Sequence, residues 1–211
     1  MIIVLDYGMG NLRSVQKVLE RIGQTARISD RPEDVAGADR LVVPGVGAFS
    51  DAMSALRERG LAEAIREFVQ RGRPLLGICL GLQVFFEESE ETASGGASAA
   101  EGLGLLAGRV VQFGDAVRAQ GLKVPHMGWN AVQVVRPSAL FYGMAEGGVY
   151  FYFAHSYYAV PADPEVVTGR TEYGVSFTSA VASGNVLATQ FHPEKSQAAG
   201  LRVLENFATR T

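Results

Sequence analysis

The first half of the chain alternates short apolar runs with stretches whose apolar residues recur at helical spacing. The apolar runs predict four buried strands, at Ile2 to Leu5, Thr25 to Ile28, Leu41 to Val43 and Leu75 to Ile78. Helical spacing predicts one helix through Leu12, Val15, Val18, Leu19 and Ile22, and one or two more, broken near Gly60, through Leu56, Ile65, Phe68 and Val69. Strands and helices in alternation indicate a parallel sheet covered on both faces.

The second half has many strand-like runs and few helices between them. These runs predict antiparallel strands added to the same domain, at Gly108 to Phe113, Trp129 to Val135, Val149 to Phe153, Val166 to Thr171 and Val186 to Phe191. A last helix is predicted from Leu201, Leu204 and Phe207, which share one face. The stretch Thr92 to Glu101, rich in Gly, Ala and Ser, predicts a flexible surface loop. We therefore expect one α/β domain over residues 1–211, with a mainly parallel, mixed sheet flanked by helices.

Composition narrows the compartment and the kinds of partner. A single cysteine excludes an intrachain disulfide framework and fits a reducing cytoplasm. Nineteen basic and 22 acidic residues give a net charge of −3, which leaves no electrostatic footprint for nucleic acid. The longest strongly apolar stretch, Pro74 to Phe86, is too short to span a bilayer, and the N-terminus lacks the basic region of a signal peptide. We expect a soluble cytoplasmic protein that binds neither nucleic acid nor membrane.

The only cysteine, Cys79, falls where a predicted strand meets a tight turn and a helix. A thiol at such a turn faces the positive end of the helix dipole, which favours the nucleophilic thiolate. Gly77 and Gly81 flank the cysteine and permit the strained backbone of an elbow. A lone cysteine in an apolar stretch is more often a small buried hydrophobic residue, so a catalytic role depends on groups elsewhere in the chain.

Such groups occur at the end of the strand Val186 to Thr189. His192 follows it, Pro193 stops the strand, and Glu194 lies two positions further on. In extended backbone, residues two apart point the same way, so the Glu194 carboxylate is expected beside the His192 imidazole. A carboxylate there can hold one ring nitrogen and leave the other to face a nucleophile. The tripeptide alone is equally compatible with a solvated loop.

Taken together, Gly77 to Gln83 and His192 to Glu194 resemble the nucleophile and His-x-Glu motifs of the class I (triad) glutamine amidotransferases. Pro44 to Gly47, which alone would suggest only a turn, directly follows the strand Leu41 to Val43 and resembles the oxyanion loop of that family. Order and spacing match over essentially the whole chain. The resemblance implies the family's flavodoxin-like fold, and we expect neither a cofactor nor a metal site.

The resemblance also implies roles for individual residues. Cys79 attacks the side-chain amide of glutamine, His192 carries the proton to the departing ammonia, and Glu194 orients His192. Water then hydrolyses the glutamyl thioester, and the backbone N–H groups of Gly47 and Leu80 bind the oxyanion.

The resemblance points further to residues that bind the two ends of free glutamine. Gln83 is one of them, and Glu91 matches the ammonium group, whereas Glu87, Glu88 and Glu90 fit a solvated helix end. Backbone around His155, Ser156 and Tyr157 holds the carboxylate, and His155 is expected to shape the pocket rather than act as a second base.

Three segments resemble, more narrowly, the family of glutaminase subunits of imidazole glycerol phosphate synthase, in histidine biosynthesis. They are Asp6 to Asn11, Pro125 to Asn130 and Tyr152 to Tyr157, and Pro44 to Phe49 has the same form. In that family the partner is a (β/α)8-barrel cyclase, which takes the ammonia through its core and stimulates glutamine hydrolysis when its ribotide ligand is bound. The heterodimer interface implied by the resemblance comprises Met9, Asn11, Met127, Trp129, Tyr152 and Lys195. Ordinary core packing is the alternative for Trp129.

Three other interpretations stay open at this point. The chain could be the glutaminase of another pathway, such as pyridoxal phosphate or anthranilate synthesis, although Met127 to Asn130 disfavours it. It could be a non-catalytic regulatory protein on the same scaffold, which should have lost part of the triad. It could also be a cysteine peptidase or redox sensor of related fold, against which the placement of His192 to Glu194 argues.

Overall fold

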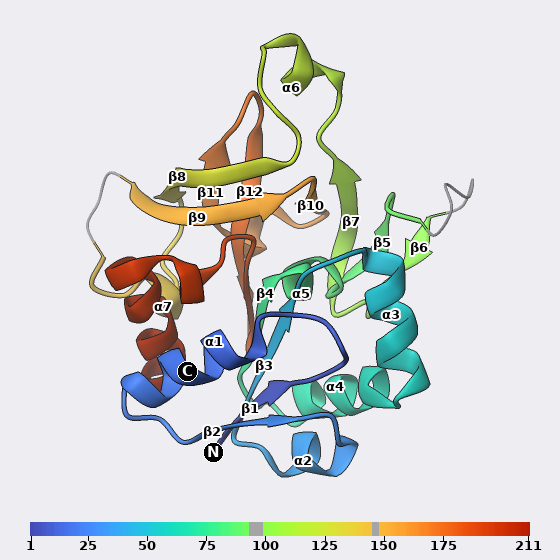
Figure 1. Cartoon of the computed structure of the whole chain (residues 1–211), viewed down its shortest axis with the longest axis vertical. Coiled ribbons are helices and arrows are strands. Elements are labelled where there is room, and N and C mark those ends of the chain that lie inside the picture. The colour runs from blue at the N-terminus through green and yellow to red at the C-terminus, as the bar shows by residue number, and fades with distance from the viewer. Residues whose placement is uncertain (93–98, 145–147) are drawn as a thin grey trace.

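The computed structural model describes residues 1–92, 99–144 and 148–211 (Figure 1). The loop predicted for Thr92 to Glu101 lies largely outside these residues. In the described part of the chain, a nine-stranded sheet runs through the molecule in the order β2-β1-β3-β4-β13-β12-β11-β8-β9, and a smaller sheet has the order β10-β7-β5-β6. The mixed α/β fold expected from the sequence is confirmed.

The first five strands of the large sheet are parallel, and they include all four strands predicted in the first half. Their bounds are β1 Ile2–Leu5, β2 Ala26–Ser29, β3 Arg40–Gly45, β4 Leu75–Cys79 and β13 Val186–Thr189. Antiparallel strands extend this sheet beyond β13, as predicted for the second half. The run Val186 to Phe191 was expected among them, and that part of the prediction is wrong, because its strand β13 is parallel to β4. They are β12 Ser176–Ser183, β11 Val167–Glu172, β8 His126–Val134 and β9 Val149–His155.

The smaller sheet was not predicted from the sequence as a separate layer. It consists of β5 Phe86–Ser89, β6 Ala100–Glu101, β7 Leu106–Gln112 and β10 Tyr157–Pro161. Its strand β5 begins three residues after the helix that follows Cys79, so the expectation of a solvated helix end at Glu87 and Glu88 is wrong. Both glutamates lie in a strand whose terminal residues, Phe86 and Ser89, are buried.

Helices cover both faces of the parallel strands. Successive residues of a strand point to opposite faces of the sheet, and here the residues on both faces are apolar. Ile3 and Leu5 of β1 pack on one side with α3 and α4, whereas Ile2 and Val4 pack on the other side with α1 and α7 (Figure 1). The break predicted near Gly60 is confirmed, since this residue separates α3 from α4 with φ of +68°. The helix bounds are α1 Leu12–Arg21, α2 Pro32–Gly37, α3 Phe49–Glu58, α4 Leu61–Gln70, α5 Leu80–Gln83, α6 Asp115–Ala119 and α7 Gln197–Arg210.

Sheet order brings distant segments of the chain to one edge. Strands β4 and β13 are neighbours, with Ile78 opposite Thr189, so the segments that follow both strands leave the sheet side by side. On the other side of β4, Gly45 of β3 lies opposite Cys79. The carboxyl ends of parallel strands are where ligands bind in open α/β sheets. Among the described residues, none of the helices is long and apolar enough to cross a membrane.

Candidate active site

Cys79 is the strained residue of the turn between β4 and α5. Its backbone has φ of 56° and ψ of −107°, a conformation that costs a non-glycine residue on the order of 1–3 kcal/mol. Gly77 and Gly81 were expected to permit this strained backbone, and neither does so by taking up a positive φ itself. The two glycines instead provide space: a Cβ on Gly81 would lie 1.8 Å from the carbonyl oxygen of Val43, and one on Gly77 would lie 2.6 Å from the Phe85 ring.

The helix after the cysteine is a single turn, which corrects the sequence argument from the helix dipole. Because α5 contains only the four residues Leu80–Gln83, few peptide dipoles are aligned behind Cys79. The Leu80 N–H is at the first helical position, where an amide has no acceptor within the helix. A charged partner for the sulfur must come from elsewhere.

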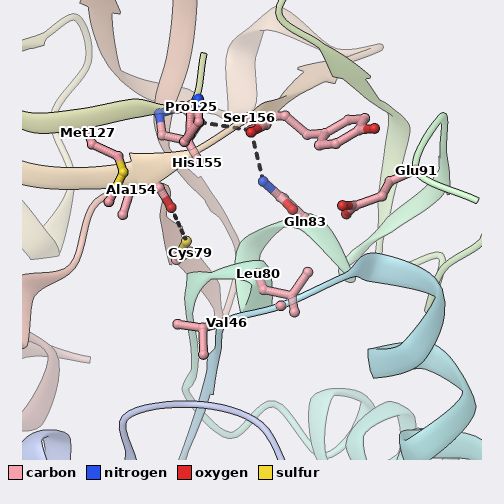
Figure 2. A pocket seen from close by; sticks show the side chains of 12 residues that line it. Val46, Cys79, Leu80, Gln83, Glu91, Pro125, Met127, Ala154, His155 and Ser156 are labelled. Carbon is pink, nitrogen blue, oxygen red and sulfur yellow. Dashed lines mark hydrogen bonds between the residues drawn. The ribbon is translucent and has the colours of Figure 1, made fainter. Parts of the chain in front are cut away.

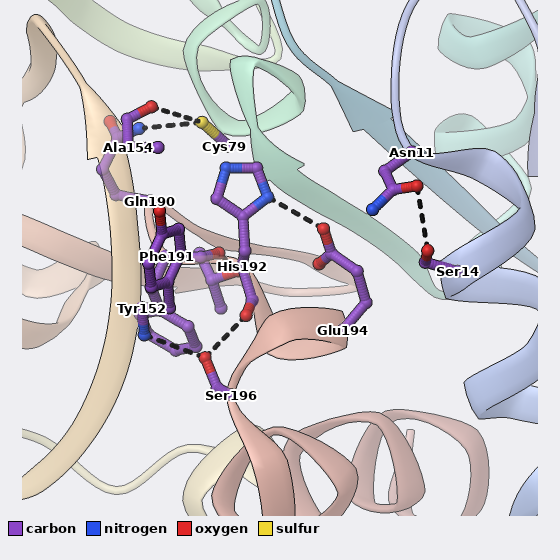
Figure 3. Close-up of polar contacts among 11 residues, drawn as sticks. Asn11, Ser14, Cys79, Tyr152, Ala154, Gln190, Phe191, His192, Glu194 and Ser196 are labelled. Carbon is purple, nitrogen blue, oxygen red and sulfur yellow. Dashed lines mark hydrogen bonds and ion pairs between the residues drawn. The ribbon is translucent and has the colours of Figure 1, made fainter. Parts of the chain in front are cut away.

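That partner is His192, whose ring lies between Cys79 and Glu194 (Figure 3). Its Nδ1 is 2.9 Å from Glu194 Oε1, and both side chains are almost completely buried. The predicted pairing is thus confirmed, but not the extended backbone behind it, because Pro193–Lys195 form a turn of 3-10 helix. Backbone hydrogen bonds fix the histidine further, from its N–H to Tyr152 O and from Ser196 Oγ to its own carbonyl oxygen.

Charge in this triad stabilises the imidazolium form of the histidine. Burial opposes a charged ring, but the negative charge of Cys79 and the contact with Glu194 outweigh it and raise the pKa of His192 to about 10. The second ring nitrogen, Nε2, is buried without a hydrogen-bond partner on the side of Cys79 (Figure 3). An imidazolium beside a cysteine sulfur favours the thiolate, which is the form that acts as a nucleophile.

A pocket of about 210 Å³ opens above the thiol (Figure 2). Gln83 lies in its wall, and its Nε2 donates both to Tyr157 O at 2.9 Å and to Gln190 Oε1 at 3.1 Å. Both N–H groups of Gln83 are therefore engaged, so its side-chain oxygen is the atom left for a ligand. The lining residues are Val46, Gly47, Cys79, Leu80, Gln83, Glu91, Pro125, Met127, Ala154, His155, Ser156 and Tyr157.

Glu91 is the acidic group of the pocket, as the sequence predicted. Its Oε2 accepts a hydrogen bond of 2.9 Å from the Phe49 N–H, at the first residue of α3. Partial burial raises the pKa of Glu91, and that hydrogen bond acts in the opposite direction. The contact joins the pocket wall to the helix that follows Pro44 to Gly47, so one carboxylate can both meet an ammonium group and anchor that loop.

The loop itself lies against the turn between β1 and α1. Gly47 has φ of +108°, which glycine adopts without strain, and a Cβ there would come 3.7 Å from Met9 Sδ. Met9 is partly buried in this contact, whereas the loop residues Val46 and Gly47 are exposed at the pocket. Asn11 is the last residue of the same turn before α1, and its Oδ1 accepts from Ser14 Oγ at 2.9 Å.

His155, on the far wall of the pocket, forms a buried chain of hydrogen bonds with His126. His155 Nδ1 contacts Tyr157 O at 2.8 Å, so that nitrogen carries the proton and Nε2 accepts from His126 Nδ1 at 3.0 Å. Asn130 Nδ2 then donates to His126 Nε2 at 3.3 Å. Burial lowers the pKa of His126 to about 4 and that of His155 to about 3, which agrees with a shaping role for His155 rather than that of a second base.

This pair predicts that the fold loses stability in mild acid. Both histidines are neutral in the folded state. Protonation of His155 at Nε2 would oppose the His126 Nδ1–H across 3.0 Å, and protonation of His126 at Nε2 would oppose the Asn130 Nδ2–H across 3.3 Å. The unfolded chain takes up these protons near pH 6.5, so the free energy of unfolding should fall as pH drops below that value. Each histidine contributes up to about 1.4 kcal/mol per pH unit. Urea unfolding between about pH 5 and 6.5, above the range of most carboxylates, measures the slope.

A matched variant separates the pair from other titrating groups. His126→Phe keeps an aromatic ring against Tyr173 and Phe153, whose ring centroids lie 4.0 and 4.8 Å from that of His126. The variant should be less stable at neutral pH because His155 Nε2 loses its donor, yet its pH slope should decrease by about one proton. Equal slopes in the two proteins would show that the pair is not the source of acid sensitivity.

On the outer surface beside the triad, three of the predicted interface residues form a stack. Trp129 lies opposite Tyr152 in the β8–β9 register, their rings meet edge to face at 6.3 Å, and Lys195 Nζ lies 5.7 Å from the Tyr152 ring centre. Trp129 is 46% exposed and Met127 on the same strand is 63% exposed, so core packing of the tryptophan is excluded. Met9 and Asn11 belong to the β1–α1 turn and are not in this stack.

Two buried residues at the site had no role in the sequence analysis. Gln190 Nε2 lies 3.6 Å from Cys79 Sγ, and His126 supports the pocket wall through His155. A signal for Gln190 existed, because it stands two positions before His192, the spacing already used for Glu194. His126 lies within the segment Pro125 to Asn130, in which only Met127 and Trp129 were assigned a role, as residues of the subunit interface.

Comparison with known proteins agrees with this geometry. The family model for glutamine amidotransferase class-I matches residues 3–211. HisH subunits of imidazole glycerol phosphate synthase from Syntrophotalea carbinolica and Moorella thermoacetica are each 54% identical to this chain. Each match covers 98% of this chain, together with 98% of the Syntrophotalea protein and 93% of the Moorella protein. Among solved structures, a glutamine amidotransferase has a TM-score of 0.73 at 23% identity, and the match covers 99% of this chain and 100% of that one. The structure of PurLQS from Thermotoga maritima has a TM-score of 0.75 at 21% identity, and the match covers 99% of this chain and 97% of that one.

The chain therefore belongs to the class I glutamine amidotransferases and is an enzyme with the fold of this class. Within the class it is a HisH-type chain, the glutaminase subunit of imidazole glycerol phosphate synthase. The family resemblance seen in the sequence is confirmed at both levels. Identity of this order over nearly the whole chain also decides against a glutaminase of another pathway.

Proposed function

We propose that this chain, as one domain over residues 1–211, hydrolyses glutamine through Cys79, His192 and Glu194. The observation that carries the assignment is the buried pair of His192 and Glu194, 2.9 Å apart, beside the thiol at the base of a 210 Å³ pocket. Cys79 Sγ attacks the side-chain amide carbon, and the carbonyl oxygen becomes an oxyanion. The His192 imidazolium then gives its proton to the departing nitrogen, which leaves as ammonia, and a thioester remains.

Water completes the cycle at the same site. Neutral His192 takes a proton from a water molecule as it attacks the thioester carbon, and collapse of the second oxyanion expels glutamate and restores the Cys79 thiolate. Glu194 holds the ring in one orientation through both steps. The proposed oxyanion donors are the backbone N–H groups of Leu80, the first residue of α5, and of Gly47, in the exposed loop opposite.

The pocket wall supports specific roles in binding free glutamine. The Gln83 oxygen and the Glu91 carboxylate can accept hydrogen bonds from the substrate ammonium, and the backbone at His155, Ser156 and Tyr157 borders the opposite wall, where the carboxylate would bind. Because two charged ends are recognised at fixed separation, the pocket is suited to glutamine rather than to a peptide.

The ammonia is proposed to pass to a (β/α)8-barrel cyclase that covers the face around Trp129. An exposed tryptophan and methionine, with the half-buried Tyr152 beside them on one strand pair, are typical anchors of a subunit contact. Met127 lies both on this face and in the wall of the pocket, so the pocket opens towards the proposed partner. The remaining proposed interface residues are Met9, Asn11, Tyr152 and Lys195.

Ammonia release from L-glutamine tests the activity and the partnership together. We expect a stable complex with the cyclase subunit of an imidazole glycerol phosphate synthase by size-exclusion chromatography. Glutamine hydrolysis should rise at least about tenfold in the complex when the ribotide ligand of the cyclase is present, a decrease of about 1.4 kcal/mol in the barrier. L-Asparagine, shorter by one methylene, serves as the control substrate.

Two outcomes would contradict the proposal in different ways. Equal release of ammonia from asparagine and glutamine would contradict the substrate assignment. Hydrolysis of glutamine without complex formation, in the presence of the cyclase and its ligand, would contradict the partner while leaving the glutaminase chemistry in place.

A further inference from the structure

Gln190 is a completely buried polar residue with no role in the steps proposed above. It follows β13 directly, and its backbone N–H donates to Ser179 O at 2.9 Å, which fixes the residue at the centre of the large sheet. Its side chain extends between Gln83 and Cys79. Burial of a primary amide beside a reactive sulfur requires that every donor and acceptor be directed at a specific partner.

The orientation of this amide follows from the hydrogen bonds of its neighbours. Tyr157 O can only accept, so the nitrogen of the Gln83 amide must face it, at 2.9 Å. The other N–H of Gln83 then donates to Gln190 at 3.1 Å, which requires the Gln190 oxygen at that position. The Gln190 nitrogen is consequently left facing Cys79 Sγ, at 3.6 Å (Figure 3). A flipped amide would oppose two donors, and the buried ladder excludes it.

The sulfur therefore lies between an acceptor that favours the neutral thiol and a donor that favours the thiolate. Ala154 O, at 3.9 Å, can accept a hydrogen bond from the neutral thiol but repels a thiolate. Gln190 Nε2 donates, so its contact strengthens when the sulfur becomes negative. Cys79 is only 5% exposed, so little water is present to solvate an anion there. Gln190 is thus the neutral group that can stabilise the thiolate in place of solvent.

We propose, building on the glutaminase function above, that Gln190 is a catalytic residue which donates a hydrogen bond from Nε2 to the Cys79 thiolate, with Gln83 as its positioning residue. The donor acts twice in the cycle, once when the thiolate attacks and again when it leaves the second tetrahedral intermediate. Because Gln83 also lines the pocket, the residue proposed to contact the substrate and the donor at the sulfur belong to one ladder of amides.

Alkylation of the thiol tests this contact directly. The chain has one cysteine, so the rate of carbamidomethylation by iodoacetamide, followed by mass spectrometry across pH, reports on Cys79 alone. Gln190→Glu keeps an oxygen that accepts from Gln83 but loses the donor to the sulfur. Gln190→Met loses both groups while the side chain keeps a similar length. We expect both variants to alkylate at least about tenfold more slowly near pH 7 than the wild type, with the profile displaced to higher pH.

Steady-state kinetics and a substitution at Gln83 distinguish a catalytic role of Gln190 from a merely structural one. For both variants, kcat for glutamine should fall about 10- to 100-fold with KM little changed, because the lost hydrogen bond is to a reacting atom. Gln83→Glu should displace the alkylation profile as well, since a carboxylate cannot donate to the Gln190 oxygen and the Gln190 amide is then free to turn its nitrogen away from the sulfur. Gln133→Glu, an exposed change on β8, should leave both measurements at wild-type values.

The outcomes separate this inference from the proposed function. An alkylation profile unchanged in folded Gln190→Glu or Gln190→Met would overturn the role of Gln190, whatever the glutaminase rate. A displaced profile in a protein whose wild type releases no ammonia from glutamine would uphold the contact and contradict the proposed reaction. Far-UV circular dichroism identifies which variants fold; should Gln190→Met not fold, an unchanged profile in Gln190→Glu and Gln83→Glu together would overturn the inference equally.

Discussion

Replacement of Cys79 with alanine is expected to abolish ammonia release from glutamine, with a loss of kcat of at least about 10³-fold. No other cysteine exists in the chain to replace the nucleophile, and the covalent route requires a thiolate at this position. The fold should be retained, because alanine fills most of the same space and the side chain makes only two long polar contacts, at 3.6 and 3.9 Å. A coupled ammonia assay on the purified complex with the cyclase measures the effect.

Free ammonium chloride provides the internal control for this variant. Cyclase turnover supported by ammonium should be the same with Cys79→Ala as with the wild type, since that reaction bypasses glutamine. The proton affinity of His192 should also decrease, because the charge of Cys79 is the largest contribution that raises its pKa. Glutaminase activity that persists in Cys79→Ala would refute the nucleophile assignment, and loss of the ammonium-dependent reaction would indicate a disrupted complex instead.

Replacement of Gly81 with alanine is expected to destabilise the protein by at least about 3 kcal/mol. The new Cβ would lie 1.8 Å from the Val43 carbonyl oxygen and 3.0 Å from its carbon, so rigid backbone rather than a flexible side chain stands in the way. Relief requires that α5 move off β3, which would displace the Cys79 turn and the Leu80 N–H with it. Urea unfolding gives the loss of stability, and the rate of Cys79 alkylation reports the displaced turn.

Gly37→Ala is the matched control for this substitution. Gly37 is the last residue of α2, its φ is not positive, and a Cβ added there would have no heavy atom within 4 Å. The free energy of unfolding should therefore stay within about 0.5 kcal/mol of the wild-type value or increase slightly. A Gly81→Ala protein as stable as Gly37→Ala would show that β3 and α5 can separate without cost, contrary to their close packing at Val43.

The parallel half of the fold could be predicted because its strands are apolar along their whole length. Ile2 to Leu5 was predicted residue for residue, since all four side chains are buried on one face or the other. The small sheet could not be predicted in this way. In β5 only Phe86 and Ser89 are buried, and its pairing with β7 joins residues about twenty positions apart. Strand β12 is rich in serine, threonine and alanine and becomes a buried strand only because β11 and β13 flank it.

The triad could be predicted because its signals are local, whereas the orientation of its neighbours is not. Three sequence positions suffice to place Glu194 beside His192, even though the backbone between them proved helical rather than extended. The direction in which the Gln190 amide points depends on Gln83 and on Tyr157, which lie on other elements of the sheet and pocket. Likewise, His126 and His155 are neutral because burial disfavours a charged ring, and the Tyr157 carbonyl oxygen fixes which nitrogen of His155 carries the proton. No sequence motif encodes either effect.

The position of β13 in the sheet has a consequence for when the site can exist at all. This strand lies in the middle of the sheet, between β4 and β12, although β4 ends at Cys79 and β13 begins only at Val186. During synthesis β4 must therefore wait for the whole segment between them before this neighbour in the sheet exists, and the sheet cannot form progressively from one edge. The same strand carries Gln190 and His192 to Cys79. A chain interrupted before β13 thus lacks both His192 and Gln190, so the surroundings of Cys79 form only after this strand has joined the sheet.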